Sequence, residues 1–286
     1  DSNEAADIAA IALEEPPSRF IVEPMITVNS PSYDFAPVYA SKKSNVLVFA
    51  SSRESSAGTG EDPITGEAYM DLFTSTQDKK GRWSEPEPLG NTISTEDNEG
   101  AASYDKKFKT IYFTRCVDQD GSNLACDIYY APIMGNNFGA SQPLFLVDRD
   151  QDDSTQIGHP ALSIDGNCMV FASDLAGGFG GKDLWFAVFN DDNETWGLPQ
   201  NLGGSINTAG DEMFPSFRAN GALYFSSNGH GGLGGFELCY ADKREGVMAF
   251  SEVDVLPYPL NTANDELGII FKDQTNTGIL SSNRNG

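Results

Sequence analysis

Positively charged side chains are scarce in this sequence. Its 286 residues include 18 Lys and Arg against 42 Asp and Glu, which leaves a formal net charge of −24 at pH 7. Such a surface repels a phosphate backbone, and no run of basic residues offers a local exception. We therefore expect no nucleic-acid partner.

Histidine and long apolar runs are also lacking. Only His159 and His230 occur, neither lies in a nucleophile constellation, and no G-x-S-x-G motif is present. We expect His159, before Pro160, to pack or hydrogen-bond, and His230 to lie at a loop tip. No stretch approaches 18 consecutive apolar residues, and the opening Asp-Ser-Asn-Glu does not begin a signal peptide. We expect no catalytic residue, membrane span or export signal.

Cysteine is rare, with four residues in the chain. Cys116 ends one strand-like segment and Cys126 begins the next, a placement that suits a disulfide across a hairpin. A bridge there would imply an oxidising compartment. The alternative is four free thiols. Cys168 and Cys239 lie within apolar runs and are expected to be buried and free.

What the sequence has is a repeat. Segments of the "VFAS" type recur with aligned positions 64, 58, 54 and 55 residues apart. The aligned residues are Phe49, Phe113, Phe171, Phe225 and Leu280. Each full period also holds an inner strand before this one, an acidic residue that leads a third strand, and an aromatic residue that opens a fourth. Four short strands in a period of about 55 residues, separated by turn residues, predict a β-propeller blade.

The expected fold is an all-β propeller of four-stranded antiparallel blades that occupies residues 19 to 286. We place the first four blades near residues 35–95, 96–157, 158–210 and 211–264. The fifth is expected to combine residues 265–286 with an outer strand from residues 20–34, so that the two termini share the closing blade. Residues 1 to 18 are alanine-rich and end at Pro16-Pro17, which predicts a tether with helical propensity.

A glycine-rich segment imitates a cofactor motif. Gly229, Gly231 and Gly234 have the spacing G-x-G-x-x-G, which binds a dinucleotide when a helix follows. Here a strand-like segment follows, and residues 177 to 181 form a similar loop one repeat earlier. We interpret both as hairpin loops and expect no cofactor.

The repeats resemble a known family. "SIDGNCMVFASDLAGGFGGKDLWFA" and "NLGGSINTAGDEMFPSFRANGALYFSSNGHGGLGGFELCYA" are similar to the TolB-type propeller repeats of periplasmic proteins in Bacteroidota. More narrowly, they resemble outer-membrane-associated lipoproteins with an OmpA-like domain, such as the PorE-type lipoproteins of the type IX secretion system. The resemblance covers residues 20 to 286. It implies a periplasmic location and a docking role among envelope proteins of a secretion machinery, with peptidoglycan bound only by domains outside this chain.

Acidic residues recur at the start of the inner strands. Asp34, Glu99, Glu212 and Glu266 occupy this position in four repeats, and Ile157 occupies it in the third. One interpretation is a ring of carboxylates at one mouth of the channel that binds a cation or ligand. The alternative, which we favour, is that each accepts hydrogen bonds from the Asn-Thr link between blades.

Two acidic clusters have some of the spacing of calcium loops, around Asp118 and Asp120 and across residues 148 to 153. The second lacks the glycine turn and the bidentate glutamate, so a bound calcium ion is not favoured. We interpret both clusters as solvated loops.

Strand parity places the irregular loops on one face of the ring. The links between blades and the loops between second and third strands form this face, which we call the loop face; the short hairpins form the turn face. Loops on a rigid scaffold are where binding usually resides. The partner-binding candidates there are Glu61, Asp62, Asp148, Asp150, Asp152 and Asp153. The sequence thus predicts a non-enzymatic docking domain, with a glycan-binding or glycosidase-like propeller that uses channel carboxylates as the alternative.

Overall fold

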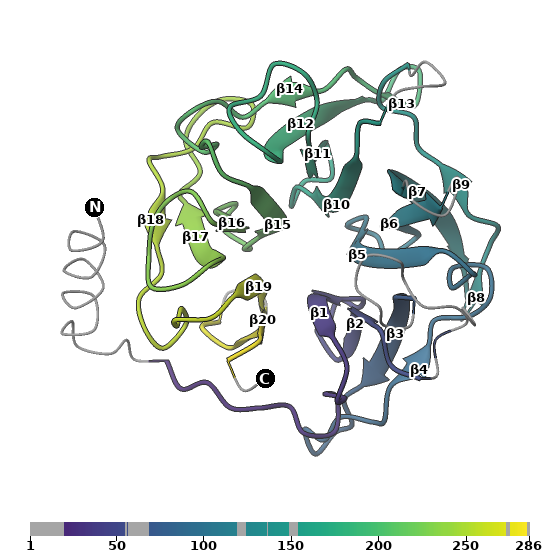
Figure 1. The fold of residues 1–286 in the computed structure, drawn as a ribbon. Coiled ribbons are helices and arrows are strands. Elements are labelled where there is room, and N and C mark those ends of the chain that lie inside the picture. The colour runs from purple at the N-terminus through teal and green to yellow at the C-terminus, as the bar shows by residue number, and fades with distance from the viewer. Residues whose placement is uncertain are drawn as a thin grey trace.

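The computed structural model describes residues 20–54, 56, 69–118, 124–135, 137–148, 154–272 and 275–284. Throughout these ranges the regular structure is β-strand, without a helix. Antiparallel sheets stand around a central axis as the blades of a propeller (Figure 1). A helix long and apolar enough to cross a membrane is not found in the described part of the chain. The predicted tether at residues 1 to 18 lies outside it.

Four blades are complete, and each runs outward from the axis in chain order. The first blade contains β1 (Asp34–Tyr39), β2 (Val46–Ser51), β3 (Asp71–Thr76) and β4 (Glu87–Pro88). The second contains β5 (Asn98–Tyr104), β6 (Thr110–Asp118), β7 (Leu124–Met134), β8 (Asn137–Phe138) and β9 (Gln142–Pro143). The third contains β10 (Ile157–Leu162), β11 (Cys168–Ser173), β12 (Asp183–Asn190), β13 (Thr195–Trp196) and β14 (Gln200–Asn201). The fourth contains β15 (Glu212–Phe217), β16 (Leu223–Ser227), β17 (Glu237–Ala241) and β18 (Asp254–Val255).

The fifth place in the ring is only partly filled. It holds a two-stranded sheet of β19 (Glu266–Phe271) and β20 (Gly278–Ser282). The inner strands of this place come from residues 265–286, as expected, but the prediction of five blades with an outer strand from residues 20–34 is wrong: the complete blades number four, and residues 20 to 33 form no strand. The physical reason is that this segment lies against the sheet through side chains, without joining its ladder of hydrogen bonds.

Those side chains close the ring. Phe20 and Val22 pack on the cluster around Leu260 and Ile269 of the fifth place. Farther along, Met25 and the buried Val28 pack with side chains of both the first blade and β19–β20, among them Phe49. The N-terminal segment thus runs along the outer side of the two-stranded sheet to the first blade (Figure 1), and a cavity of about 350 Å³ remains between them.

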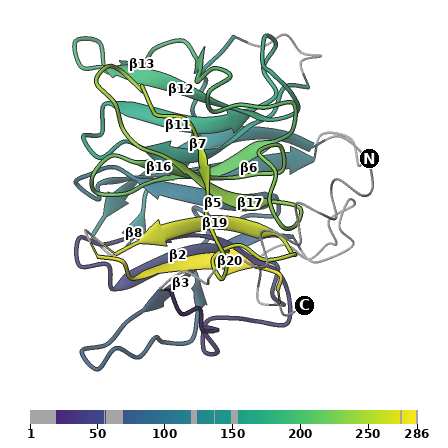
Figure 2. The ribbon, with the colours of Figure 1, turned by 90° about the vertical axis from the view of Figure 1, so that its left-hand side faces the viewer.

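The hydrophobic core lies between blades. In the contact of the third and fourth blades, Val170 and Leu184 from one sheet meet Leu223 and Phe225 from the next. The "VFAS" strands are buried on both sides because each middle strand has a blade on either flank, which explains their near-continuous apolar sequence. Seen from the side, the strands run across the ring between its two faces (Figure 2).

Every inner strand has a β-bulge at the same place. The register shifts after Phe35, Gly100, Gly158, Met213 and Glu266. The residue in each bulge has a positive φ angle; these residues are Ala36, Ala101, His159, Phe214 and Gly268. Proline follows in three of the five, which suits a position where the ladder lacks a donor. The bulges direct the chain toward the axis, where they surround a cavity of only about 30 Å³.

Candidate functional site: the links between blades and the loop face

The glycine-rich loop is a hairpin between β16 and β17, as the sequence predicts. Several of its backbone N–H groups are already bonded within the chain. Glu237 Oε1 accepts hydrogen bonds from the backbone N–H groups of Leu233 and Gly234. One repeat earlier, Asp183 Oδ2 accepts from the Phe179 N–H at 2.6 Å. The donors that would hold a pyrophosphate therefore serve the acidic residue that leads each third strand.

The carboxylates at the inner strands are buried in the contacts between blades. Glu99, Glu212 and Glu266 have no exposed surface. Each accepts two hydrogen bonds from a threonine four residues earlier, in the link that enters its own blade. For Glu212 these come from the Thr208 N–H at 2.9 Å and the Thr208 hydroxyl at 2.7 Å.

Asp34 repeats this arrangement with a serine. Its Oδ2 accepts from the N–H and the hydroxyl of Ser30 at 2.6 and 2.8 Å. All four carboxylates are thus bonded to their own links, and three of them have no exposed surface. This is the geometry of the second interpretation, in which they fix the links.

A second contact joins each link to the preceding blade. The Glu212 N–H donates to the Lys182 carbonyl at 2.6 Å, and the Glu266 N–H donates to the Phe236 carbonyl at 2.9 Å. The side chain of Asn207 both accepts from the Leu184 N–H and donates to the Leu184 carbonyl. The Asn-Thr link therefore extends the edge of one blade and orients the first strand of the next.

Three arginines complete these contacts, and the sequence reasoning missed them. Arg53, Arg115 and Arg284 form ion pairs with Asp34, Glu99 and Glu266. Each guanidinium also donates to a carbonyl in the link, as Arg115 does to Ile93 at 2.8 Å. An arginine at the end of the second strand or shortly after it, in three of five repeats, was the available signal.

His230 takes the place of arginine in the fourth blade. Its Nε2 lies 2.7 Å from the Ile206 carbonyl oxygen, which corresponds in the repeat to Ile93 and Leu260. Because a carbonyl only accepts, Nε2 carries the proton. His230 is thus an anchor for a link between blades, and not the loop-tip residue that the sequence predicts.

Two buried carboxyls have raised pKa values. Burial, together with the nearby carboxylates of Glu266 and Asp265, raises the pKa of Glu237 to about 7, against the lowering effect of its two backbone donors. Burial and a hydrogen bond with Asp71 raise the pKa of Glu99, although Thr95 and Arg115 favour its ionised form. Both pKa shifts arise at contacts between neighbouring sheets. Asp71 of the first blade interacts with Glu99 of the second, and Glu237 of the fourth blade interacts with Glu266 of the fifth place.

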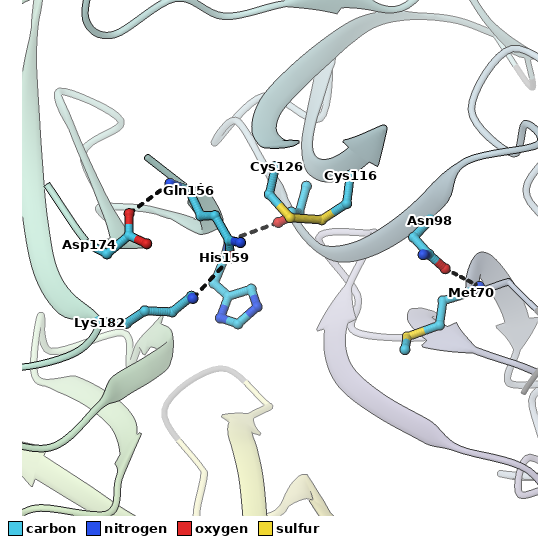
Figure 3. Close-up of a disulfide and its surroundings, with 9 residues drawn as sticks. Met70, Asn98, Cys116, Cys126, Gln156, His159, Asp174 and Lys182 are labelled. Atoms are coloured by element: carbon cyan, nitrogen blue, oxygen red, sulfur yellow. Dashed lines mark hydrogen bonds between the residues drawn. A yellow bond between two sulfur atoms is a disulfide. The ribbon is translucent and has the colours of Figure 1, made fainter. Parts of the chain in front are cut away.

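His159 lies at the axis, where it packs as predicted. Its ring stacks on Phe214 with centroids 4.1 Å apart, and the Phe214 N–H points to its Nδ1 at 3.4 Å. Burial and the charge of Lys182 lower its pKa to about 3, so the ring is neutral. Lys182 itself donates to the Gln156 side chain beside it (Figure 3).

The structure joins Cys116 to Cys126 across the β6–β7 hairpin, where the two residues face each other in register. Figure 3 shows this disulfide between the two strands. Cys168 and Cys239 are free and buried.

Of the acidic candidates on the loop face, the structure describes Asp148, which is exposed. The others, Glu61, Asp62, Asp150, Asp152 and Asp153, lie outside the described residues, as does Asp120. Exposed acids that are described on this face are Glu54, Glu96, Asp148 and Asp174. In the ranges given above, no group of three or more His, Cys, Asp or Glu could hold a metal ion.

Comparisons with known proteins identify no family and find distant structural similarity. No protein-family model matches the sequence, and neither does any curated protein sequence. Solved structures with a similar chain path include TolB from Acinetobacter baumannii, with a TM-score of 0.43 and 14% identity over 85% of this chain and 53% of that one. The chain thus spans about half the length of TolB.

Two further solved structures with a similar chain path are named as enzymes. CoXyl43, a GH43 β-xylosidase/α-arabinofuranosidase from a compost microbial metagenome, has a TM-score of 0.49 and 14% identity over 91% of this chain and 87% of that one. PpgL, a periplasmic gluconolactonase of Pseudomonas aeruginosa, has a TM-score of 0.46 and 12% identity over 84% and 61%. At such scores they carry no argument about activity, substrate or partner.

Proposed function

We propose that this chain is a non-enzymatic docking domain of a periplasmic, outer-membrane-associated protein, and that its loop face binds a locally basic envelope protein. The observation that carries the proposal is that the repeated carboxylates are bonded to the links between blades. They make the ring rigid and leave the irregular loops of one face for recognition.

The charge of the loop face suits such a partner. Arg53, Arg115 and Arg284 lie on this side of the ring, but each is paired with a carboxylate at the start of an inner strand and adds little positive potential. Glu54, Glu96, Asp148 and Asp174 are exposed there. The resulting negative field would accelerate association with a basic surface and make it sensitive to salt.

The narrower form of the proposal is a part in a type IX secretion complex. It rests on the resemblance of the third and fourth repeats to the PorE-type lipoproteins. A pull-down from a Bacteroidota envelope extract, with the propeller as bait, is the direct way to identify the partner. Recovery of secretion-machinery components would support this form, and their absence from a pull-down that recovers other envelope proteins would contradict it.

The docking surface is tested by two matched triple variants. One replaces Glu54, Glu96 and Asp148 on the loop face by Gln, Gln and Asn. The other replaces Asp191, Asp192 and Glu194 on the turn face by Asn, Asn and Gln, which removes the same charge from exposed positions. We expect the loop-face variant alone to bind the captured partner more slowly at low salt, with the fold unchanged. Slower association of the turn-face variant alone would assign the partner to the opposite face.

The glycosidase alternative requires carboxyl groups that face a substrate, about 5 to 5.5 Å apart for retention or farther apart for inversion. Glu99 and Glu212 are instead buried in different interfaces and bonded to Thr95 and Thr208. A screen on envelope glycans tests this point. Turnover that Glu99→Gln or Glu212→Gln abolishes, in variants that remain folded, would overturn the docking proposal.

A further inference from the structure

Basic side chains gather around the axis on the turn face. The five hairpins between first and second strands span residues 40–45, 105–109, 163–167, 218–222 and 272–277, and together hold seven basic residues against three acidic ones. The basic residues are Lys42, Lys43, Lys106, Lys107, Lys109, Arg218 and Lys272. In a chain with 18 basic and 42 acidic side chains, this reversal of sign is local, and the net charge of the whole chain conceals it.

The same hairpins surround a depression, which we call the axial pocket. It has a volume of about 390 Å³, and all five sheets contribute to its wall. The wall combines aromatic rings, among them Tyr39, Phe108 and Phe271, with hydroxyl groups such as Ser103 and Ser216. Lys42 and Lys106 line it directly. Its size falls in the range of pockets that hold small molecules.

The pocket is closed at its inner end. The bulged segments of the inner strands, including the stacked rings of His159 and Phe214, fill the axis and leave the cavity of about 30 Å³ described above. A ligand would therefore enter from the turn face and remain there. Its apolar part would contact the aromatic wall, and its polar end would lie among the lysines.

Of the three acids in these hairpins the structure describes Asp105, which also lines the pocket, and Asp165; both are bonded within their own turns. Asp105 accepts hydrogen bonds from the backbone N–H groups of residues 107, 109 and 110. Asp165 accepts from the Ser163 hydroxyl and the Asn167 N–H, and these bonds lower its pKa. Both carboxylates are held by their own turns, as Asx residues often are.

Two of the cations are held in place by neutral groups. The Lys106 ammonium donates to the Asp165 carbonyl oxygen at 2.8 Å. The Arg218 guanidinium lies over the Phe271 ring, 4.6 Å from its centroid, and donates to the Thr275 carbonyl. No ion pair involves Lys42, Lys106 or Arg218 in the part of the chain that the structure describes. Lys106 and Arg218 are thus positioned without forming an ion pair among the described residues.

From this geometry we propose that the axial pocket binds a small organic anion: an aromatic or aliphatic body that fits about 390 Å³ and bears a carboxylate, sulfonate or phosphate group directed at Lys42 and Lys106. This site lies on the face opposite the proposed docking surface. It does not depend on that proposal, and either can fail without the other.

The test compares two fluorescent probes that share one aromatic ring system and differ in charge. 8-Anilinonaphthalene-1-sulfonate carries one negative charge, and N-phenyl-1-naphthylamine has the same ring system without it. Fluorescence titrations use the wild-type chain, the Lys42→Gln/Lys106→Gln variant, and Lys79→Gln/Lys80→Gln as a control. The control removes two exposed positive charges from the hairpin between β3 and β4 on the same face, away from the axis.

We expect saturable binding of the sulfonate that weakens about five-fold in the Lys42→Gln/Lys106→Gln variant, since two partly exposed charge contacts contribute about 1 kcal/mol together. The control is expected to bind it as the wild type does, and the neutral probe to bind all three proteins alike. The proposal is overturned by the absence of saturable sulfonate binding, by equal loss in both variants, or by a loss that the neutral probe shares.

Discussion

Gly234 lies against the backbone of Ala263, so close that a Cβ atom on residue 234 would stand 2.7 Å from the Ala263 carbonyl carbon. Gly180 meets Ala209 in the same way one repeat earlier. The glycine loops are thus shaped by the link to the next blade, which passes directly over them. Their composition reflects packing between blades and not phosphate binding.

Gly234→Ala should destabilise the fold, because the added methyl group would meet backbone atoms of Ala263 and Asn264, which cannot move aside as a flexible side chain can. We expect a loss of about 2 kcal/mol in the free energy of unfolding, as for other overpacked sites. Urea denaturation of the wild type and the variant measures it. Gly100→Ala is the control, since a Cβ atom there meets nothing within 4 Å; equal losses at both positions would refute the packing explanation.

Substitution of His230 tests its role as a link anchor. His230→Ala leaves the Ile206 carbonyl without its donor and should cost about 1 kcal/mol in unfolding free energy. His230→Arg supplies the side chain that other blades use at this place and should retain most of the stability. The midpoint of urea denaturation distinguishes the two variants. If both were as stable as the wild type, the contact with Ile206 would be of no energetic importance.

Stability should fall as the pH rises from about 5 to 8. The pKa of Glu237 is raised to about 7 from an ordinary value of 4.5, so the folded chain holds this proton more tightly than the unfolded chain does. Its stabilising effect is complete below about pH 4.5 and is lost as the pH passes through the folded pKa. Each such proton contributes a slope of at most about 1.4 kcal/mol per pH unit.

The variant Glu237→Gln keeps an oxygen acceptor for the Leu233 and Gly234 donors and removes the titration. It should therefore show a shallower dependence of unfolding free energy on pH between 5 and 8. Glu252→Gln, an exposed acid, controls for the general relief of negative charge. A slope for Glu237→Gln that matches the control would contradict the assignment.

Peptide mapping without reductant should find one disulfide, between Cys116 and Cys126, with Cys168 and Cys239 as thiols. Because the two thiols are buried, they should react with an alkylating agent only after unfolding. Replacing both bridged cysteines by serine should cost roughly 3 kcal/mol on the chain-entropy model. Four reactive cysteines in the absence of reductant would remove the argument for an oxidising compartment.

The repeat in the sequence predicts most of the fold because each strand type carries its own pattern. The doubly buried "VFAS" strand and the acidic residue before the third strand can both be recognised without a structure. The position of Glu212 five residues after Asn207 likewise indicates a contact within the link. These features are local, so a single sequence is enough to expose them.

The fifth blade could not be predicted in this way. Residues 20 to 28 have the apolar composition of an outer strand, but Phe20, Val22 and Met25 pack on the neighbouring sheets without forming a strand. Composition does not distinguish packing from strand pairing. The excess of basic side chains on the turn face could not be predicted for another reason. It appears only when the hairpins of five repeats, from Lys42 to Lys272, are placed around one axis.

The two-stranded sheet in the fifth place makes the packing between neighbouring sheets uneven around the ring. Between the third and fourth blades, two full sheets share a continuous core, whereas β20 lies against a segment without ladder hydrogen bonds. Amide hydrogens in β19 and β20 should therefore exchange with solvent sooner than those in β11 and β16, through local openings that leave the other blades folded. Within the described residues, the sector of β19 and β20 is therefore the point of least resistance to opening of the ring.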